Sequence, residues 1–170
     1  ANIKIVVSIF FGGSVKFRIL FGIIFLALAS LTVADELRSA VDSKDRSEKN
    51  VARDEFRKPY ETLSFFQLEP DMTIVELSPG GGWYTEILAN YIRKSGNLIA
   101  AHFSKDSDRA YFRNSRIKFE KKVKENDLYE KVTVVDLNSE LSDPSSVDAV
   151  LTFRNLHNWL GPNMDKIFSN

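Results

Sequence analysis

The sequence contains no cysteine, and only two of its 170 residues are histidine, at positions 102 and 157. Without cysteine the chain forms no disulfide and offers no thiolate to a metal ion or a substrate. The histidines are not spaced as H-E-x-x-H, and no G-x-S-x-G string occurs, so neither a zinc hydrolase nor a serine hydrolase is supported. We therefore expect no metal site and a chemistry other than hydrolysis.

An excess of charge of one sign is also missing. The chain has 23 basic and 23 acidic residues, and residues 35–170 hold 20 of the basic ones and all of the acidic ones. A protein that binds nucleic acid in general shows a clustered basic face. The lysine-rich stretch 118–125 is interpreted instead as the solvated face of a helix. We expect no nucleic-acid partner.

The first 34 residues are typical of a secretory signal peptide. Lys16 and Arg18 precede an uncharged apolar run over residues 19–31, and small residues follow at 32–34. A basic segment, an apolar segment of about 7 to 15 residues and a small-residue cleavage site are the parts of such a signal. We expect cleavage after Ala34 and export. The alternative is an uncleaved membrane anchor. This is less favoured, because the apolar run is shorter than the ~20 residues of a membrane-spanning helix.

After the signal, the sequence divides into a linker with a helical extension, residues 35–66, and a cofactor-binding domain, residues 67–170. Ser47 is expected to cap a helix from Glu48 that kinks or restarts at Pro59, because proline cannot continue an ideal helix. The buried side of that helix is expected to hold Ala52, Phe56, Tyr60 and Leu63. Since the chain starts with alanine and stops within an amphipathic pattern, we expect it to be a fragment.

The most informative stretch is residues 73–88, which read T-I-V-E-L-S-P-G-G-G-W-Y-T-E-I-L. An apolar, β-branched run meets Glu76, and a proline with three glycines then leads into a segment with apolar residues at helical spacing. This pattern predicts a strand, a tight loop and a helix. Glycine has no Cβ, so the loop can take positive φ and approach a ligand closely. In an open parallel sheet, ligands bind at such a loop.

Two familiar phosphate-binding motifs fit this loop poorly. A P-loop needs G-x-x-x-x-G-K-[ST], and no such lysine is present. A dinucleotide-binding loop needs G-x-G-x-x-G; Gly80 and Gly82 fit, but Thr85 stands at the third position. A nicotinamide-dependent oxidoreductase therefore stays open as a weaker alternative.

The remainder of the domain continues the strand and helix alternation. Further strands are expected over residues 97–103, 131–135 and 147–153. A helix is expected after the glycines to about residue 94, and another over 107–126, with a break near 114–115. The inward side of the second helix is expected to hold Tyr111, Phe112, Phe119 and Val123.

The acidic residue and the glycines resemble the first motif of the class I S-adenosylmethionine-dependent methyltransferases, an acid followed by G-x-G-x-G. In this chain the motif is Glu76 followed by S-P-G-G-G at 78–82, with serine at the first glycine position. The strings at 75–88 and 50–66 also resemble a bacterial subgroup of predicted methyltransferases that carry a signal peptide. The resemblance implies a Rossmann-like α/β fold of about four parallel strands here, with the C-terminal strands of the family missing. It further implies S-adenosylmethionine as cofactor, methyl transfer to an acceptor that is a small molecule or unknown, and a periplasmic location.

The resemblance also implies which residues contact the cofactor. The full set is Glu76, Ser78, Pro79, Gly80, Gly81, Gly82, Trp83, Tyr84, His102, Phe103, Asp136 and Leu137. Glu76 would hold the methionine end, and Trp83 and Tyr84 would wall the pocket. His102 stands where the family places a ribose-binding carboxylate, and Asp136 would reach the adenine amino group. The alternatives are that His102 is a plain strand-end residue and that Asp136 is a turn residue.

Candidates for contact with the methyl acceptor follow the fourth strand, namely Arg154, Asn155 and His157. A histidine with a pKa of about 6.5 can serve as a general base; the alternative is a histidine that packs at the start of a helix. Residues 53–61 would form either a lid, through Arg53, Asp54, Arg57 and Glu61, or a surface helix with ion pairs. A scaffolding protein that kept the fold and lost the cofactor also stays open, because of His102 and the export signal.

Overall fold

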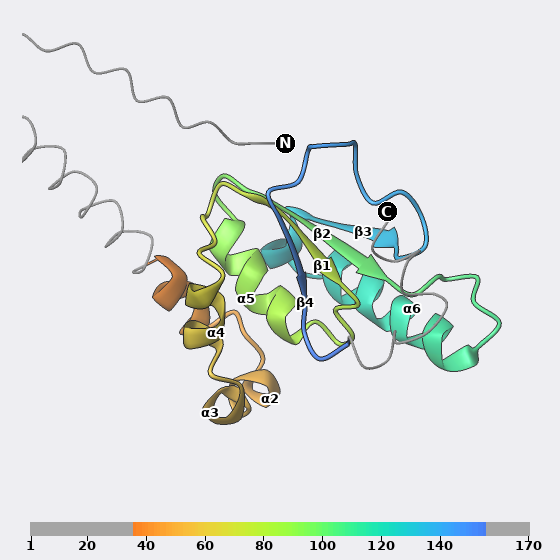
Figure 1. Ribbon diagram of the computed structural model, residues 1–170. Helices are drawn as coiled ribbons and strands as arrows, with labels where there is room; N and C mark the ends of the chain where they lie inside the picture. The colour runs from red at the N-terminus through yellow and green to blue at the C-terminus, as the bar shows by residue number, and fades with distance from the viewer. Residues whose placement is uncertain (1–35, 156–170) are drawn as a thin grey trace, which may run out of the picture.

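The computed structural model describes residues 36–155, which fold around a parallel β-sheet. Its strands are β1 (Thr73–Leu77), β2 (Asn97–His102), β3 (Val132–Asp136) and β4 (Ala149–Thr152). They lie in the order β3-β2-β1-β4, and every neighbouring pair is parallel (Figure 1). The predicted α/β class and the parallel sheet of about four strands are confirmed in this part of the chain.

The strand order reverses beside β1. Leu77, the last residue of β1, lies opposite Ala101 of β2 on one side and opposite Thr152 of β4 on the other. In an open parallel sheet, ligands bind at the carboxyl ends of the strands where the order reverses, because the connections there leave in opposite directions. The loops that follow β1 and β4 therefore border the expected ligand site.

Two helices cover one face of this sheet (Figure 1). Helix α5 (Trp83–Ile92) connects β1 to β2, and α6 (Ala110–Lys124) with the 3₁₀ turn η1 (Asp127–Tyr129) connects β2 to β3. The main core lies under them, with Ile74, Ile87 and Leu98 fully buried. A smaller cluster on the opposite face contains Val75, Leu77, Ala101 and Leu137. Burial on both faces explains why the central strands are almost continuously apolar.

The second long helix differs from its expected form. Helix α6 runs without a break through residues 114–115, because two residues of modest helix propensity cost less than the packing of Phe119 and Arg116 gains. Tyr111, expected to point inward, is 73% exposed. Phe119 is buried as expected, and Val123 packs against the core.

The segment before β1 is broken into short helices. Residues 36–41 are helical, and α2 (Glu48–Val51), α3 (Asp54–Arg57) and α4 (Pro59–Phe65) follow. The prediction that Ala52, Phe56, Tyr60 and Leu63 share one buried helix side is wrong. The left-handed backbone at Lys58 (φ 46°) turns the chain between α3 and α4, and Phe56 is 80% exposed. The restart at Pro59 is confirmed. The hydroxyl of Ser47 does not cap α2; it donates to Glu86 in α5.

None of the helices within residues 36–155 combines the length and apolar character needed to cross a membrane. The predicted signal peptide and His157 lie outside the described residues.

Candidate functional site

The loop after β1 has the unusual backbone that its glycines predict. Ser78, Gly80 and Gly82 all have positive φ, at 54°, 60° and 79°. A Cβ on Gly82 would lie 3.0 Å from the ring of Phe119, so this glycine lets the loop approach α6. No heavy atom would lie within 4 Å of a Cβ on Gly80 or Gly81, which leaves their outer side open. The loop thus packs against the helix at one end and is free toward solvent at the other.

Lys122 of α6 holds this loop in place, although the sequence suggested a solvated lysine. Its Nζ donates to the carbonyl oxygen of Gly81 at 3.2 Å and forms a 2.7 Å ion pair with Glu86, whose side chain is buried. Ser47 also donates to Glu86, at 3.1 Å. A signal for Lys122 was its spacing of three residues from the buried Phe119, which places both on one helix face.

His102 ties the end of β2 to the same loop. The side chain is fully buried, and its Nε2 lies 3.0 Å from the carbonyl oxygen of Gly80. The Nδ1 atom accepts a 2.7 Å hydrogen bond from the backbone N–H of Phe103, so the proton resides on Nε2. Burial lowers the pKa of His102, which keeps the ring neutral. Both ring nitrogens serve the backbone, and a contact with ribose stays a prediction.

The residues predicted to contact the nucleoside lie at the ends of β2 and β3. Phe103 stacks on Phe112 with ring centroids 4.2 Å apart. The carboxylate of Asp136 accepts a 3.0 Å hydrogen bond from the N–H of Asn138, as in a turn, and Leu137 is buried in the smaller core cluster. Arg116 of α6, which the sequence did not single out, is buried and donates to the carbonyl oxygens of both strand ends. Contacts of these residues with adenine stay predictions.

A cavity of about 500 Å³ opens beside the glycine loop, at the carboxyl ends of β1 and β4. Its wall contains the predicted residues Glu76, Ser78, Pro79, Gly80, Gly81, Trp83, Tyr84, Arg154 and Asn155. Gly82, His102, Phe103, Asp136 and Leu137 are not part of this wall. The opposite side is formed by the segment of α2 and α3, including two residues of the suggested lid, Arg53 and Arg57. The other two, Asp54 and Glu61, do not line the cavity.

Glu76 is the acid of this cavity. Its side chain is 2% exposed, and Oε2 accepts a 2.6 Å hydrogen bond from Thr85. Burial raises the pKa of Glu76 to about 7, while the hydrogen bond from Thr85 and the charge of Lys122 oppose the rise. No residue within 36–155 donates to its other oxygen, Oε1. A cation entering the cavity would lower this pKa and be bound by the ionised carboxylate.

Aromatic rings form the apolar part of the wall. Tyr84 stacks on Phe153 with centroids 3.5 Å apart, and Trp83 meets Tyr84 edge to face at 4.5 Å. The indole N–H of Trp83 donates to the carbonyl oxygen of Asn50 at 2.8 Å, which joins α5 to α2. Phe153 was not predicted as a site residue, because its contact with Tyr84 depends on the pairing of β4 with β1.

Arg154 and Asn155, which follow β4, differ in their contacts. The Nδ2 of Asn155 lies 3.3 Å from the carbonyl oxygen of Leu77, 3.2 Å from that of Ser78 and 3.1 Å from the hydroxyl of Thr152. This amide holds the ends of β1 and β4 together. Arg154 has a positive φ of 63° and is exposed at the cavity.

The fold of this chain is similar to that of a solved structure. A similar solved structure is the crystal structure of a SAM dependent methyltransferase from Aquifex aeolicus, with a TM-score of 0.56. This chain has a Rossmann-like methyltransferase fold. The sequence identity is 20%, so the likeness concerns the fold; it covers 77% of this chain and 63% of that chain, less than two thirds of its length. No protein-family model and no curated protein matches the sequence.

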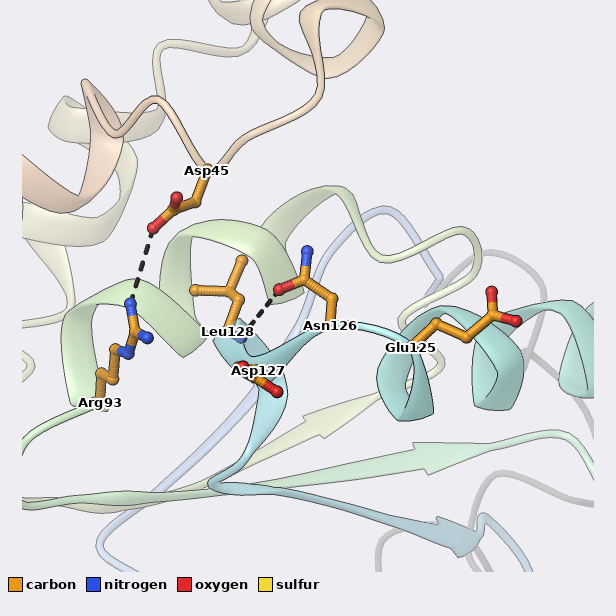
Figure 2. A pocket seen from close by; sticks show the side chains of 6 residues that line it. All are labelled: Asp45, Arg93, Glu125, Asn126, Asp127 and Leu128. Atoms are coloured by element: carbon orange, nitrogen blue, oxygen red, sulfur yellow. Dashed lines mark hydrogen bonds and ion pairs between the residues drawn. The ribbon is translucent and has the colours of Figure 1, made fainter.

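A second cavity of this methyltransferase-like fold has a different set of lining residues from the cavity at the glycine loop (Figure 2). It measures about 380 Å³ and lies between the segment before α2, the end of α5 and η1. Figure 2 shows two interactions among its lining residues: Asp45 pairs with Arg93 at 3.6 Å, and Asn126 accepts a hydrogen bond from the N–H of Leu128 at 2.8 Å. None of the predicted site residues lines it. Across residues 36–155, no three His, Asp or Glu side chains are grouped to hold a metal ion.

Proposed function

We propose that this protein binds S-adenosylmethionine in the 500 Å³ cavity and transfers its methyl group to an acceptor. The observation that carries the proposal is the position of Glu76. This buried carboxylate, one oxygen of which has no hydrogen-bond partner within residues 36–155, lies one residue before the end of β1, beside a glycine loop, where the strand order reverses. This is where a Rossmann-like fold binds a nucleotide-containing ligand.

The residues of the cavity fit this cofactor chemically. Glu76 can bind the ammonium of the methionine portion, and Gly80 and Gly81 leave their outer side open to a ligand. The hydroxyl of Ser78 is buried and has no hydrogen-bond partner within residues 36–155. A buried polar group without a partner costs about 1–3 kcal/mol, a cost that a ligand contact would remove.

When bound, S-adenosylmethionine supplies a methyl group on a positively charged sulfur; a lone pair of the acceptor bonds to the carbon, and the C–S electron pair passes to sulfur. The chain contributes by holding the two reactants in line and by excluding water. Trp83, Tyr84 and Phe153 provide the apolar wall that excludes water. An acceptor N–H or O–H must also lose a proton, for which His157 stays a candidate.

One observation favours a second candidate function, a binding or scaffolding protein without the cofactor. His102 stands where the family places a carboxylate, and both of its ring nitrogens are engaged by the backbone. Use of a nicotinamide dinucleotide has less support, because Thr85, at the third glycine position, is buried and bonded to Glu76.

Calorimetric titration with S-adenosylhomocysteine tests the proposal, with NAD as the control ligand. We expect micromolar binding of the first and none of the second. The matched variant is Glu76→Gln, which keeps the shape of the side chain and removes its charge, and we expect it to weaken binding at least about tenfold. Absence of S-adenosylhomocysteine binding by the folded protein would overturn the proposal and favour the scaffold. Equal binding of NAD would favour the oxidoreductase.

A further inference from the structure

Three arginines converge on the cavity from two distant parts of the chain. Arg53 and Arg57 stand four residues apart at either end of α3, and Arg154 follows β4. The pKa of Arg57 is lowered by burial and further by the charges of Arg53 and Arg154. All three residues line the same cavity, so their like charges repel one another. Such crowding of like charge is unfavourable unless a negative group joins it.

No carboxylate of the described chain neutralises this cluster. Asp54, the acid nearest in sequence, forms two hydrogen bonds with Arg46, at 2.6 and 2.8 Å. Within residues 36–155, none of the three arginines forms an ion pair. The Nε of Arg57 is buried without a hydrogen-bond partner in the same range. A buried, charged donor without an acceptor points to a ligand that supplies one.

The cofactor does not balance these charges either. S-adenosylmethionine carries a sulfonium, an ammonium and one carboxylate, so it brings a net positive charge into the cavity. Glu76 is the single carboxylate that lines the cavity among the described residues, and Lys122 already pairs with Glu86. The combined charge of wall and cofactor is therefore positive, and it favours an anionic second ligand.

We propose that the methyl acceptor carries an anionic group, a carboxylate or a phosphate, that is bound by Arg53, Arg57 and Arg154. This inference rests on the proposed function, since it places the acceptor beside the cofactor. The guanidinium of Arg57 lies 4.5 Å from the ring centre of Trp83, a contact that holds it at the cavity wall, and a guanidinium binds carboxylate and phosphate groups well. Tyr84 and Phe153 line the same cavity and offer an apolar surface to the rest of the acceptor.

The same arginines could instead bind the carboxylate of the cofactor. The experiment therefore distinguishes an anionic group of the acceptor from the carboxylate of the cofactor. Malonate and inorganic phosphate are titrated by calorimetry into protein saturated with S-adenosylhomocysteine. We expect at least one of them to bind, and Arg57→Gln and Arg154→Gln each to weaken that binding at least about tenfold. Arg109→Gln is the matched control, because Arg109 is exposed and outside the cavity, and we expect a change below about twofold.

Four results would overturn the inference. In the first, neither anion binds the saturated protein. In the second, the anions compete with S-adenosylhomocysteine and both cavity variants lose S-adenosylhomocysteine binding, which assigns the arginines to the cofactor. In the third, Arg109→Gln weakens anion binding as much as the cavity variants do, and in the fourth, the variants at 57 and 154 leave anion binding unchanged. Thermal unfolding confirms that each variant is folded, and Arg154, being exposed, can be replaced without loss of packing. Failure of S-adenosylhomocysteine to bind the wild type would instead refute the proposed function, and the acceptor assignment with it.

Discussion

The Nε2 atom of His102 lies 3.0 Å from the carbonyl oxygen of Gly80, so the end of β2 is bonded directly to the loop that follows β1. The other ring nitrogen accepts from the N–H of Phe103. One buried imidazole thus fixes two backbone groups at the rim of the sheet. The sequence predicts a ligand contact for His102, and its observed hydrogen bonds are with the backbone.

Replacing His102 by phenylalanine keeps the ring volume and removes both hydrogen bonds. The carbonyl of Gly80 and the N–H of Phe103 then lose their partners, and we expect the free energy of unfolding to fall by about 2 kcal/mol. Urea denaturation at neutral pH measures this loss. An unchanged midpoint would show that these bonds contribute nothing to stability.

The pH dependence of that loss has a definite sign. Burial lowers the pKa of His102, so on acidification below its ordinary value the unfolded chain binds a proton that the folded chain does not. Acidification therefore lowers the stability of the wild type through His102, and the His102→Phe variant lacks this effect. The stability advantage of the wild type should therefore shrink between about pH 7.5 and 5.5. A constant advantage across that range would contradict a lowered pKa.

Replacing Glu76 by glutamine should stabilise the free protein at alkaline pH. The pKa of Glu76 is raised from 4.5 to about 7, so the folded protein holds a proton that the unfolded chain has released, and stability declines as pH rises through this window. The neutral variant avoids this decline. We expect it to be more stable at about pH 8, by at most about 3 kcal/mol, and similar to the wild type at about pH 4.5. Thermal unfolding at both pH values measures the difference, and lower stability of the variant at high pH would refute the shift.

Replacing Lys122 by methionine should destabilise the loop and the fold. The change leaves the buried Glu86 without its cation and the carbonyl of Gly81 without its donor, and we expect a loss of about 2–3 kcal/mol. The matched control is Lys121→Met, next to it on α6, whose 3.8 Å pair with Glu125 is exposed and should matter by less than about 0.5 kcal/mol. Urea denaturation compares the two variants. Equal losses in the free energy of unfolding would show that the contacts of Lys122 with Glu86 and Gly81 add nothing to stability.

Alanine at two neighbouring glycines separates packing from ligand contact. At Gly82, a positive φ and a Cβ 3.0 Å from the ring of Phe119 should cost about 1–2 kcal/mol. At Gly81 the Cβ meets nothing within 4 Å, so stability should change by less than about 0.5 kcal/mol. Any loss of S-adenosylhomocysteine affinity in Gly81→Ala therefore reports a contact with the ligand. Equal destabilisation by both substitutions would contradict the observed packing.

The sequence predicted the elements whose signals are local. The run of β-branched residues at 73–77 and the glycines at 80–82 led to β1 and its loop, and apolar spacing led to α5. The cavity wall contains most of the predicted motif residues for the same reason, since they are contiguous in the chain.

Residues that act across the fold escaped prediction. Lys122 and Glu86 are 36 positions apart, and Phe153 reaches Tyr84 because β4 pairs with β1. The left-handed backbone at Lys58 was missed, because it occurs at a lysine rather than at a glycine, the residue that favours this conformation. Local periodicity carries no information about such long-range contacts.

Glu86 accepts hydrogen bonds from Ser47, in the segment before β1, and from Lys122, in α6. A single carboxylate therefore joins the segment that brings Arg53 and Arg57 to the helix that holds the glycine loop. Cutting the chain between α4 and β1 would remove one wall of the cavity and expose this anion. The unit that forms this cavity is consequently larger than the strand and helix alternation alone, and it includes the segment from Ser47 to Arg57.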